Sequence, residues 1–295
     1  MTPFPVCPLV LIRAVFARQV LALANASGNK RLEQAFASVP RERFLGEDQW
    51  QLGTPWDGYI TLPQNDPVLI YQDVVVGLDA ARGVNNGSPV LHARWLHAMQ
   101  PRAGEVVAHI GAGTGYYTSI LAQLVGPRGK VLAVECNEKL AARLQGNLAG
   151  AANIEVICAD GATQPEFAVD CMYVNFGVAR PYGRWVENLK PGGRLVLPLG
   201  VPQMHATLPV RVIERGMGLM ITREHNGFAA RSLGAASFVF AQGAEELPDA
   251  EHEVLRRSLA SGDDQRIRSM VWRQAAHAPA WFAGKDWALS FNELA

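Results

Sequence analysis

The glycine loop at residues 111–115 constrains the fold of this chain more than any other feature. The loop reads Gly-Ala-Gly-Thr-Gly, follows an apolar segment at 106–110, and precedes a segment at 116–125 with the pattern of a helix. Glycine permits a tight turn and leaves no Cβ between the backbone and a ligand. The following helix directs unpaired N–H groups and its positive dipole end toward the same place. We therefore expect a strand–loop–helix unit that binds a ligand at the end of the strand.

Strand and helix patterns alternate after this unit. The strand segments are continuous apolar runs, which is typical of strands with both faces covered. The alternation predicts an α/β fold with a Rossmann-like, doubly wound, mostly parallel sheet. Further strands are expected at 130–135, 154–159, 169–174 and 194–199, and helices from Asn137 through Leu148 and at 182–189.

Additions flank this core on both sides. Residues 1–83 are expected to be helical with a Pro- and Gly-rich loop at 53–67, and residues 84–242 form the ligand-binding domain. Residues 243–295 are expected to form a helical extension with a Trp-rich end that packs over a sheet face. A dimer surface or a cover over the acceptor pocket are the alternatives for this extension. Three short strands, antiparallel ones included, are expected near 209–213, 219–222 and 237–241.

Composition narrows the classes of function. Lys plus Arg and Asp plus Glu both number 27, so the net charge is zero, which argues against binding nucleic acid through overall charge. The four cysteines lack the spacing of metal ligands and suit a reducing compartment, so no metal site is expected. The apolar run at 6–15 is shorter than the roughly 20 residues that span a bilayer. We expect a cytoplasmic protein without a membrane partner.

The spacing of the glycines separates two classes of cofactor. Binding of a dinucleotide pyrophosphate generally uses G-x-G-x-x-G, but here Tyr116 stands where the last glycine would be needed. The tighter G-x-G-x-G pattern suits S-adenosylmethionine. Glu135 ends the second strand, where a carboxylate can accept both ribose hydroxyls, and Asp160 ends the third, within reach of an adenine amino group. The sequence therefore predicts S-adenosylmethionine as the cofactor.

From about residue 36 to residue 200 the chain resembles the protein-L-isoaspartate O-methyltransferases. The resemblance implies the class I methyltransferase fold, the S-adenosylmethionine cofactor and an oxygen acceptor. The segments that carry it are VPRERF at 39–44, Tyr71 with Asp73, the glycine loop ending in Gly115 and Tyr116, Asp160 with Gly161, and LKPGGRLV at 189–196.

One segment departs from the family pattern. The family usually has a Gln-Thr-Ile-Ser-x-Pro-like segment before the glycine loop, whereas residues 84–89 read Val-Asn-Asn-Gly-Ser-Pro. Asn85 thus replaces the threonine, Gly87 replaces the serine, and Ser88 offers a hydroxyl one position later. His109 stands where the family usually has an acidic residue, and it is interpreted as a core histidine with a proton-transfer role as the alternative.

The predicted site combines these residues. Ser88, Asn86 and Asn175, which ends the fourth strand, are the predicted catalytic residues. Two of them have a structural alternative, since Ser88 before Pro89 is a typical helix N-cap and Asn86, like Asn85, could be an ordinary turn residue. Trp56 and Tyr59 are candidates for lining the acceptor pocket. The predicted cofactor-binding residues are Asn85, Ser88, Gly111, Gly113, Thr114, Gly115, Tyr116, Glu135, Asp160 and Gly161.

Three functions compete at this point. The favoured one is O-methylation of a carboxyl group on a protein or peptide by a monomer or homodimer. A carboxylate, with a pKa of about 4, is ionised at neutral pH and needs no general base. The second is a protein that binds the cofactor without isoaspartyl methyltransferase activity. The third, a nicotinamide-dependent oxidoreductase, is disfavoured by the glycine spacing.

Overall fold

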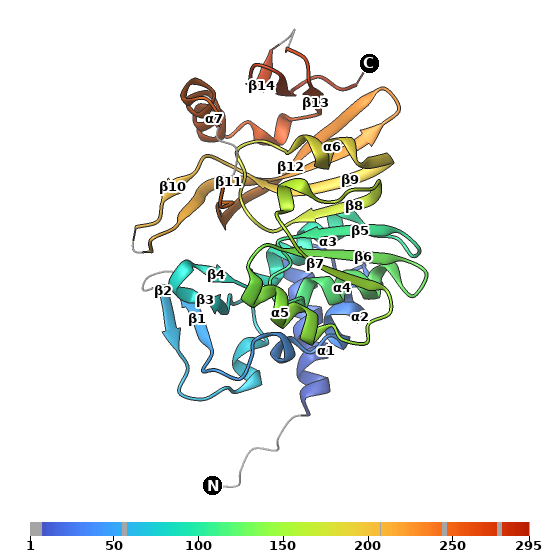
Figure 1. Ribbon diagram of the computed structural model, residues 1–295, viewed down its shortest axis with the longest axis vertical. Coiled ribbons are helices and arrows are strands. Elements are labelled where there is room, and N and C mark those ends of the chain that lie inside the picture. The colour runs from blue at the N-terminus through green and yellow to red at the C-terminus, as the bar shows by residue number, and fades with distance from the viewer. Residues whose placement is uncertain (1–7, 55–57, 207, 244–246, 276–278, 295) are drawn as a thin grey trace.

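One long sheet organises the computed structural model, which describes residues 8–54, 58–206, 208–243, 247–275 and 279–294. The sheet has 11 strands and runs through the molecule from the level of the N-terminal helices to the C-terminal end (Figure 1). Its strand order is β14-β15-β13-β12-β11-β9-β8-β5-β6-β7, with β10 paired beside β11.

The parallel half of the sheet has the predicted architecture. Four parallel pairings join its five strands in the order β9-β8-β5-β6-β7. The glycine loop lies between β5 and α4, and Asn137 caps α5 by accepting a hydrogen bond from the N–H of Leu140 at 3.1 Å. The elements are β5 (Val106–Ile110), α4 (Tyr116–Val125), β6 (Lys130–Glu135), α5 (Glu138–Asn147), β7 (Ile154–Cys158), β8 (Val169–Val174), α6 (Gly183–Glu187) and β9 (Leu189–Leu199).

Alternate residues of the central strands enter two different cores. Val107 of β5 packs with the helices α1 (Leu9–Leu23), α2 (Lys30–Ser38), α3 (Pro89–Met99) and α4. Its neighbour Ala108 packs with α6 and with α7 (Asp249–Ser261) on the other face. Both faces are covered, which explains the continuous apolar runs in these strands and confirms the doubly wound arrangement.

The second half of the sheet is antiparallel, so the sheet as a whole is mixed. β11 (Arg211–Glu224) pairs with β9 on one side and with β12 (Gly227–Val239) on the other. Three short strands were expected in this part of the chain, but the structure has two long ones. β11 takes in the first two expected strands and β12 most of the third, and the short strand β10 (Gln203–Met204) pairs beside β11. Register shifts in the β11–β12 ladder break the apolar alternation, which is why the sequence pattern divided them.

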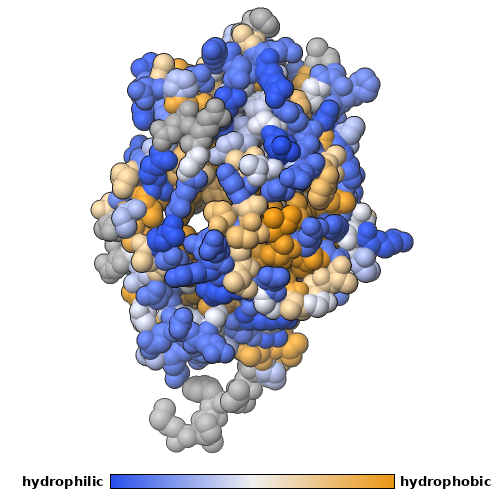
Figure 2. Space-filling model, in the orientation of Figure 1, coloured by the Kyte–Doolittle hydropathy of each residue, from blue (hydrophilic) through white to orange (hydrophobic). Residues whose placement is uncertain are grey.

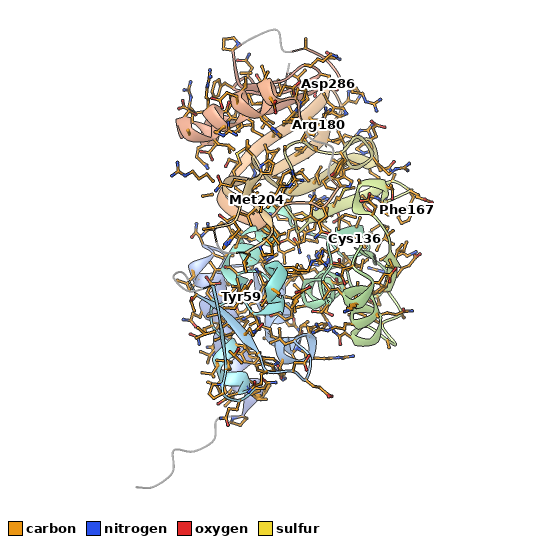
Figure 3. All side chains as sticks on the ribbon, turned by 60° about the vertical axis from the view of Figure 1, so that its left-hand side comes forward. Tyr59, Cys136, Phe167, Arg180, Met204 and Asp286 are labelled. Carbon is orange, nitrogen blue, oxygen red and sulfur yellow. The ribbon has the colours of Figure 1, made fainter. Side chains whose placement is uncertain are left out.

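The C-terminal segment corrects the prediction of a purely helical extension. After α7 it forms β13 (Ser269–Trp272), β14 (Ala280–Ala283) and β15 (Trp287–Ser290), which continue the same sheet from β12. The indole of Trp287 is fully buried against Phe282, with ring centroids 4.5 Å apart. An ion pair of 3.2 Å between Arg180 and Asp286 joins this segment to the loop after β8 (Figure 3). The segment is therefore part of the sheet rather than a separate addition.

The N-terminal region also contains strands where a loop was expected. β1 (Gln51–Thr54) and β2 (Gly58–Thr61) form an antiparallel pair that overlaps the 53–67 segment, and β3 (Gly77–Asp79) pairs with β4 (Val84–Asn85). These two hairpins lie beside the parallel half of the sheet in Figure 1. Four-residue strands flanked by Gly and Pro carry too little periodicity to be read from sequence. Within the described residues, no helix is both long and apolar enough to cross a bilayer.

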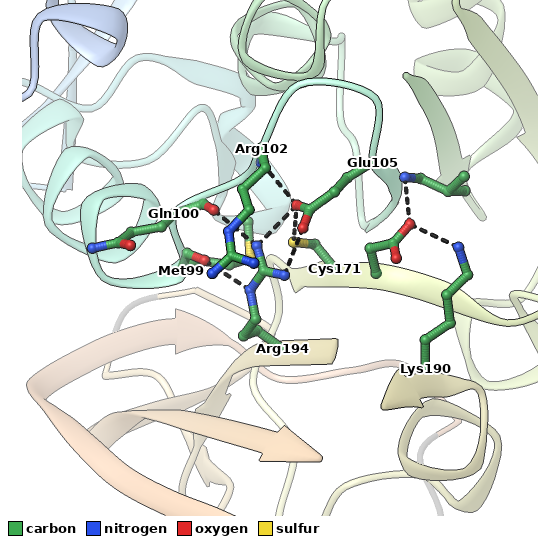
Figure 4. Close-up of polar contacts among 9 residues, drawn as sticks. Met99, Gln100, Arg102, Glu105, Cys171, Lys190 and Arg194 are labelled. Atoms are coloured by element: carbon green, nitrogen blue, oxygen red, sulfur yellow. Dashed lines mark hydrogen bonds and ion pairs between the residues drawn. The ribbon is translucent and has the colours of Figure 1, made fainter. Parts of the chain in front are cut away.

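An ion pair between the buried Arg194 and the half-buried Glu105 ties α3 to the amino ends of the parallel strands (Figure 4). Arg194 donates to both carboxylate oxygens of Glu105 at 2.8 and 2.9 Å, and to the carbonyls of Met99 and Gln100 at 3.1 and 2.8 Å. Burial opposes ionisation of Glu105, but the hydrogen bonds from Arg194 outweigh it and the pKa of this carboxyl is lowered. The 189–196 segment that carries the family resemblance therefore has a structural role.

Candidate active site

A cavity of about 1110 Å³ lies at the carboxyl ends of β5, β6 and β7. Its walls come from the glycine loop, the segment 83–88, the tips of β6 and β7, and the end of β12 near residues 235–241. Figure 2 shows the surface hollowed on its left-hand side, at the level where Figure 1 places β4 below β10 and β11. The volume slightly exceeds the usual range for ligand pockets, about 300–1,000 Å³. All the predicted site residues except Gly161 line it.

The glycine loop has the backbone conformation that its sequence implies. Gly111, Gly113 and Gly115 have φ angles of +77°, +57° and +101°, in the region that other residues rarely adopt. The N–H groups of Gly111 and Ala112 both donate to the carbonyl of Val134, at 2.9 and 3.0 Å. The first N–H groups of α4 precede the acceptors of the helix itself, so helix geometry makes them the donors that a ligand at this loop could use.

The side chains of Thr114 and Tyr116 point into the protein. The Thr114 hydroxyl donates to the carbonyl of Phe44 at 2.7 Å, and the Tyr116 ring packs edge-on against Phe44 and Phe36. Burial raises the pKa of Tyr116. These side chains fix the loop to the N-terminal region, and their backbone atoms are the part that can face a ligand.

The two predicted acids stand at neighbouring strand tips. Glu135 is 7% exposed and accepts hydrogen bonds from the N–H groups of Gly113 at 2.8 Å and Asn137 at 3.0 Å. Burial raises its pKa, and further donors such as a diol would fill its remaining acceptor positions. Asp160 is exposed at the end of β7 and accepts from the N–H of Ala162 at 2.9 Å. The glycine loop, a buried carboxylate and a second acid at the next strand tip therefore stand together, as the sequence analysis expects for an adenosyl cofactor.

Gly161 serves packing rather than the cavity wall. A Cβ at this position would lie 2.4 Å from Cγ2 of Ile110 and 3.3 Å from the ring of Phe176. Its carbonyl accepts a hydrogen bond from the indole of Trp185 at 2.8 Å. Its glycine identity follows from the close approach of β5, so its predicted cofactor contact has no support in this geometry.

Asn85 and Asn86 belong to the segment 84–89, which differs from the family pattern, and they hold the cavity wall in place. Asn85 accepts from the N–H of Gly87 at 2.8 Å and donates to the hydroxyl of Tyr59 at 2.9 Å, while Trp56 lies outside the described residues. Tyr59 supports the wall from behind and is not among the lining residues. Asn86 is buried and accepts from the N–H of Val76 at 2.8 Å. Both asparagines act on the backbone here, as their turn alternative proposes.

Ser88 has the capping role that its position before Pro89 suggested. Its hydroxyl accepts from the N–H of Leu91 at 3.2 Å and donates to Asp73 at 2.7 Å. The same Asp73 oxygen accepts from the N–H of Val90 at 3.0 Å. The hydroxyl is thus engaged at the start of α3, on the cavity rim.

Asn175, which is half-buried and lines the cavity, is hydrogen-bonded to the buried His109. The amide of Asn175 donates to Nε2 of His109 at 2.7 Å, and Nδ1 of His109 meets the hydroxyl of Thr118 at 2.8 Å. His109 is fully buried, and burial lowers its pKa to about 3. It does not line the cavity, so its surroundings agree with the core interpretation rather than with proton transfer.

Comparison with known proteins identifies the family. The sequence model of the protein-L-isoaspartate(D-aspartate) O-methyltransferases matches residues 19–226. The chain belongs to this family. It is 30% identical over 206 residues to a protein-L-isoaspartate O-methyltransferase of Methanopyrus kandleri, covering 68% of this chain and 82% of that protein. It is 32% identical over 181 residues to one from Aeropyrum pernix, covering 60% and 62%.

Solved structures agree on the fold of this methyltransferase. A protein-L-isoaspartate O-methyltransferase superposes with a TM-score of 0.61 at 23% identity, covering 77% of this chain and 66% of the other. A Plasmodium falciparum protein described as a member of the family, in complex with S-adenosyl-L-homocysteine, gives 0.58 at 16% identity, with coverage of 79% and 99%. The predicted enzyme class, an S-adenosylmethionine-dependent O-methyltransferase, and its Rossmann-like fold are confirmed.

The sequence prediction missed one functional candidate of this methyltransferase, His92. It lies in α3, is 2% exposed and lines the cavity. The signal was present, because Ser88 caps α3 and His92 follows four residues later on the same face of the helix. Strand β12 also contributes Ser237 and Phe238 to the wall. That contribution depends on long-range strand pairing, which no local pattern reveals.

Proposed function

We propose that this chain transfers a methyl group from S-adenosylmethionine to a carboxyl group of a protein or peptide, with isoaspartyl residues as the acceptor to test first. One observation carries the proposal. The glycine loop, Glu135 and Asp160 stand at the tips of three adjacent parallel strands and line one cavity in a member of this family.

The cofactor-binding roles follow from the chemistry of these residues. S-adenosylmethionine, when bound, supplies a methyl group activated by the sulfonium charge. The backbone at 111–115 and the first turn of α4 suit its carboxylate end, because the helix presents N–H donors and positive dipole there. Glu135 suits the ribose hydroxyls and Asp160 suits the adenine amino group. The two acids lie at the ends of neighbouring strands in one cavity, so both could contact a single adenosyl group.

The acceptor requires positioning rather than deprotonation. A carboxylate is already ionised at neutral pH, and His109, with a pKa of about 3 and no place in the cavity wall, is not available as a base. Leu91, Phe176 and Phe238 contribute apolar surface to the cavity wall. Holding two reactants in line contributes on the order of 7–11 kcal/mol. The residues of the chain therefore act mainly by orientation.

Location and assembly remain predictions. We infer a cytoplasmic protein, supported by the free state of Cys136, Cys158 and Cys171, which a reducing compartment maintains. A monomer or homodimer without a nucleic-acid or membrane partner is the accompanying expectation, in keeping with the balanced charge.

Methyl transfer to matched peptides tests the proposal. With labelled S-adenosylmethionine, we expect an isoaspartyl peptide to gain label and its aspartyl counterpart to gain none, and the ester to release methanol at alkaline pH. Uptake of the cofactor without label in any peptide carboxyl would instead support the cofactor-binding alternative.

A further inference from the structure

Gly87 and His92 share one space in the cavity wall. A Cβ built on Gly87 would lie 2.1 Å from Nε2 of His92 and 2.7 Å from its Cδ2. The φ of Gly87 is +71°, which glycine adopts without strain. The ring edge of His92 therefore occupies the place that any side chain at position 87 would take, and both residues line the cavity.

The imidazole of His92 is held in one orientation. It stacks on the ring of Tyr117 with centroids 3.7 Å apart and an interplanar angle of 16°. Its Nδ1 lies 2.5 Å from the hydroxyl of Tyr173. Tyr117 and Tyr173 are themselves buried in α4 and β8, so the ring is positioned by rigid elements.

The partner of Nδ1 decides which nitrogen carries the proton. Among the described residues, the buried hydroxyl of Tyr173 has hydrogen-bonding contact with His92 alone. A buried donor left unpaired costs about 1–3 kcal/mol, so the hydroxyl donates and Nδ1 accepts. In the neutral ring, the proton then lies on Nε2, the atom that faces Gly87.

The surroundings keep the ring neutral. Burial is the main reason that the pKa of His92 lies well below its usual value, and electrostatic interaction with His109 and Arg41 lowers it further. The titratable groups in direct contact with the imidazole are Tyr117 from α4 and Tyr173 from β8. Burial raises the pKa of both tyrosines, so neither carries a negative charge at neutral pH. His92 is therefore a fixed, uncharged N–H donor over a wide range of pH.

We propose that Nε2–H of His92 binds the acceptor carboxylate, donating a hydrogen bond to the oxygen that does not receive the methyl group. This inference rests on the proposed function and adds to it the residue that selects the acceptor. A neutral N–H group can bind one oxygen of the carboxylate without transferring a proton to it. The other carboxylate oxygen therefore stays nucleophilic. Gly87 is needed because a side chain at that position would displace the ring.

Replacing His92 with phenylalanine tests this role, because phenylalanine keeps the ring and its stacking on Tyr117 but removes both nitrogens. We expect the KM for the isoaspartyl peptide to rise about 10- to 100-fold, the usual effect of losing a hydrogen bond to a charged group. The Kd for S-adenosylhomocysteine should stay within about twofold, because cofactor contacts are separate. His92→Gln, which restores an N–H, should recover part of the loss.

Gly87→Ala is the matched second variant, since its methyl group would push the imidazole aside while leaving the chemistry of His92 intact. It should raise the peptide KM as well. An unchanged peptide KM in both variants would overturn the inference, as would an equal loss of cofactor affinity, which indicates a structural role. Failure of the wild-type enzyme to methylate any peptide would refute the proposed function instead.

Discussion

Replacing Arg41 with methionine is expected to lower the free energy of unfolding by about 2–6 kcal/mol, because two buried carbonyl groups lose their charged donor at about 1–3 kcal/mol each. The guanidinium is fully buried in the short helix at Arg41–Phe44. It donates to the carbonyls of Ile70, Gln72 and Val74 and to the side chain of Asn86. Methionine fills much of the space but leaves the carbonyls of Ile70 and Val74 without a donor, while the oxygens of Gln72 and Asn86 keep the N–H groups of Val74 and Val76.

The consequence reaches the cavity because these acceptors form its support. The carbonyls belong to the segment between the β1–β2 hairpin and β3, and Asn86 stands in the cavity wall. Urea unfolding followed by circular dichroism measures the loss. Arg43→Met is the control, since Arg43 lies in the same short helix but is exposed, and its loss should cost about 0.5 kcal/mol or less. Equal losses in the two variants would refute the role assigned to Arg41.

Stability is also expected to fall steeply as the pH drops from 6.5 toward 5. Burial lowers the pKa of His109 to about 3, and burial with nearby positive charge lowers that of His92 well below its usual value. In this window the unfolded chain binds a proton at each histidine while the folded protein does not. Their contribution is complete above pH 6.5 and is lost on acidification, at about 1.4 kcal/mol per pH unit for each histidine.

Because unfolded histidines are already half protonated at about pH 6.5, the two buried histidines together predict a loss of about 3 kcal/mol between pH 6.5 and pH 5. Glu105 and Asp170, whose pKa values are lowered by Arg194 and Lys190 against the effect of burial, act below this window. Denaturant titrations at half-unit intervals measure the slope. His109→Asn should roughly halve it, and substitution of the exposed His225 should leave it unchanged. A flat profile between pH 7 and pH 5 would contradict the prediction.

The sequence predicts those parts of the site that depend on local geometry. The glycine loop, Glu135 and Asp160 each lie at the end of one strand, and parallel order brings strand ends to one edge. The roles of Ser88 and Asn86 were harder to assign, because a side chain near a cavity can also bond the backbone that surrounds it. The structure shows Ser88 as the cap of α3 and Asn86 bonded to the backbone of Val76, as the structural alternatives for these two residues propose.

The rest depends on contacts between distant parts of the chain. Strands β13 to β15 have four residues each, and their pairing with β12 and with one another is not encoded in a local pattern. The proposed role of His92 depends on the space left by Gly87, five residues earlier, and on the hydrogen bond to Tyr173 on β8. The sequence shows that a hydroxyl is missing at position 87, while the structure shows what fills its space.

Calorimetric titration of S-adenosylhomocysteine into the wild-type protein and into Glu135→Gln tests the central claim most directly. Gln keeps the size of the side chain and an oxygen for Gly113 but loses the charge that a ribose diol would use. We expect one equivalent to bind the wild type and a loss of about 10- to 100-fold in the variant, the effect of weakening hydrogen bonds to a charged group. No uptake by the wild type, or equal affinity in the variant, would contradict the cofactor site described here.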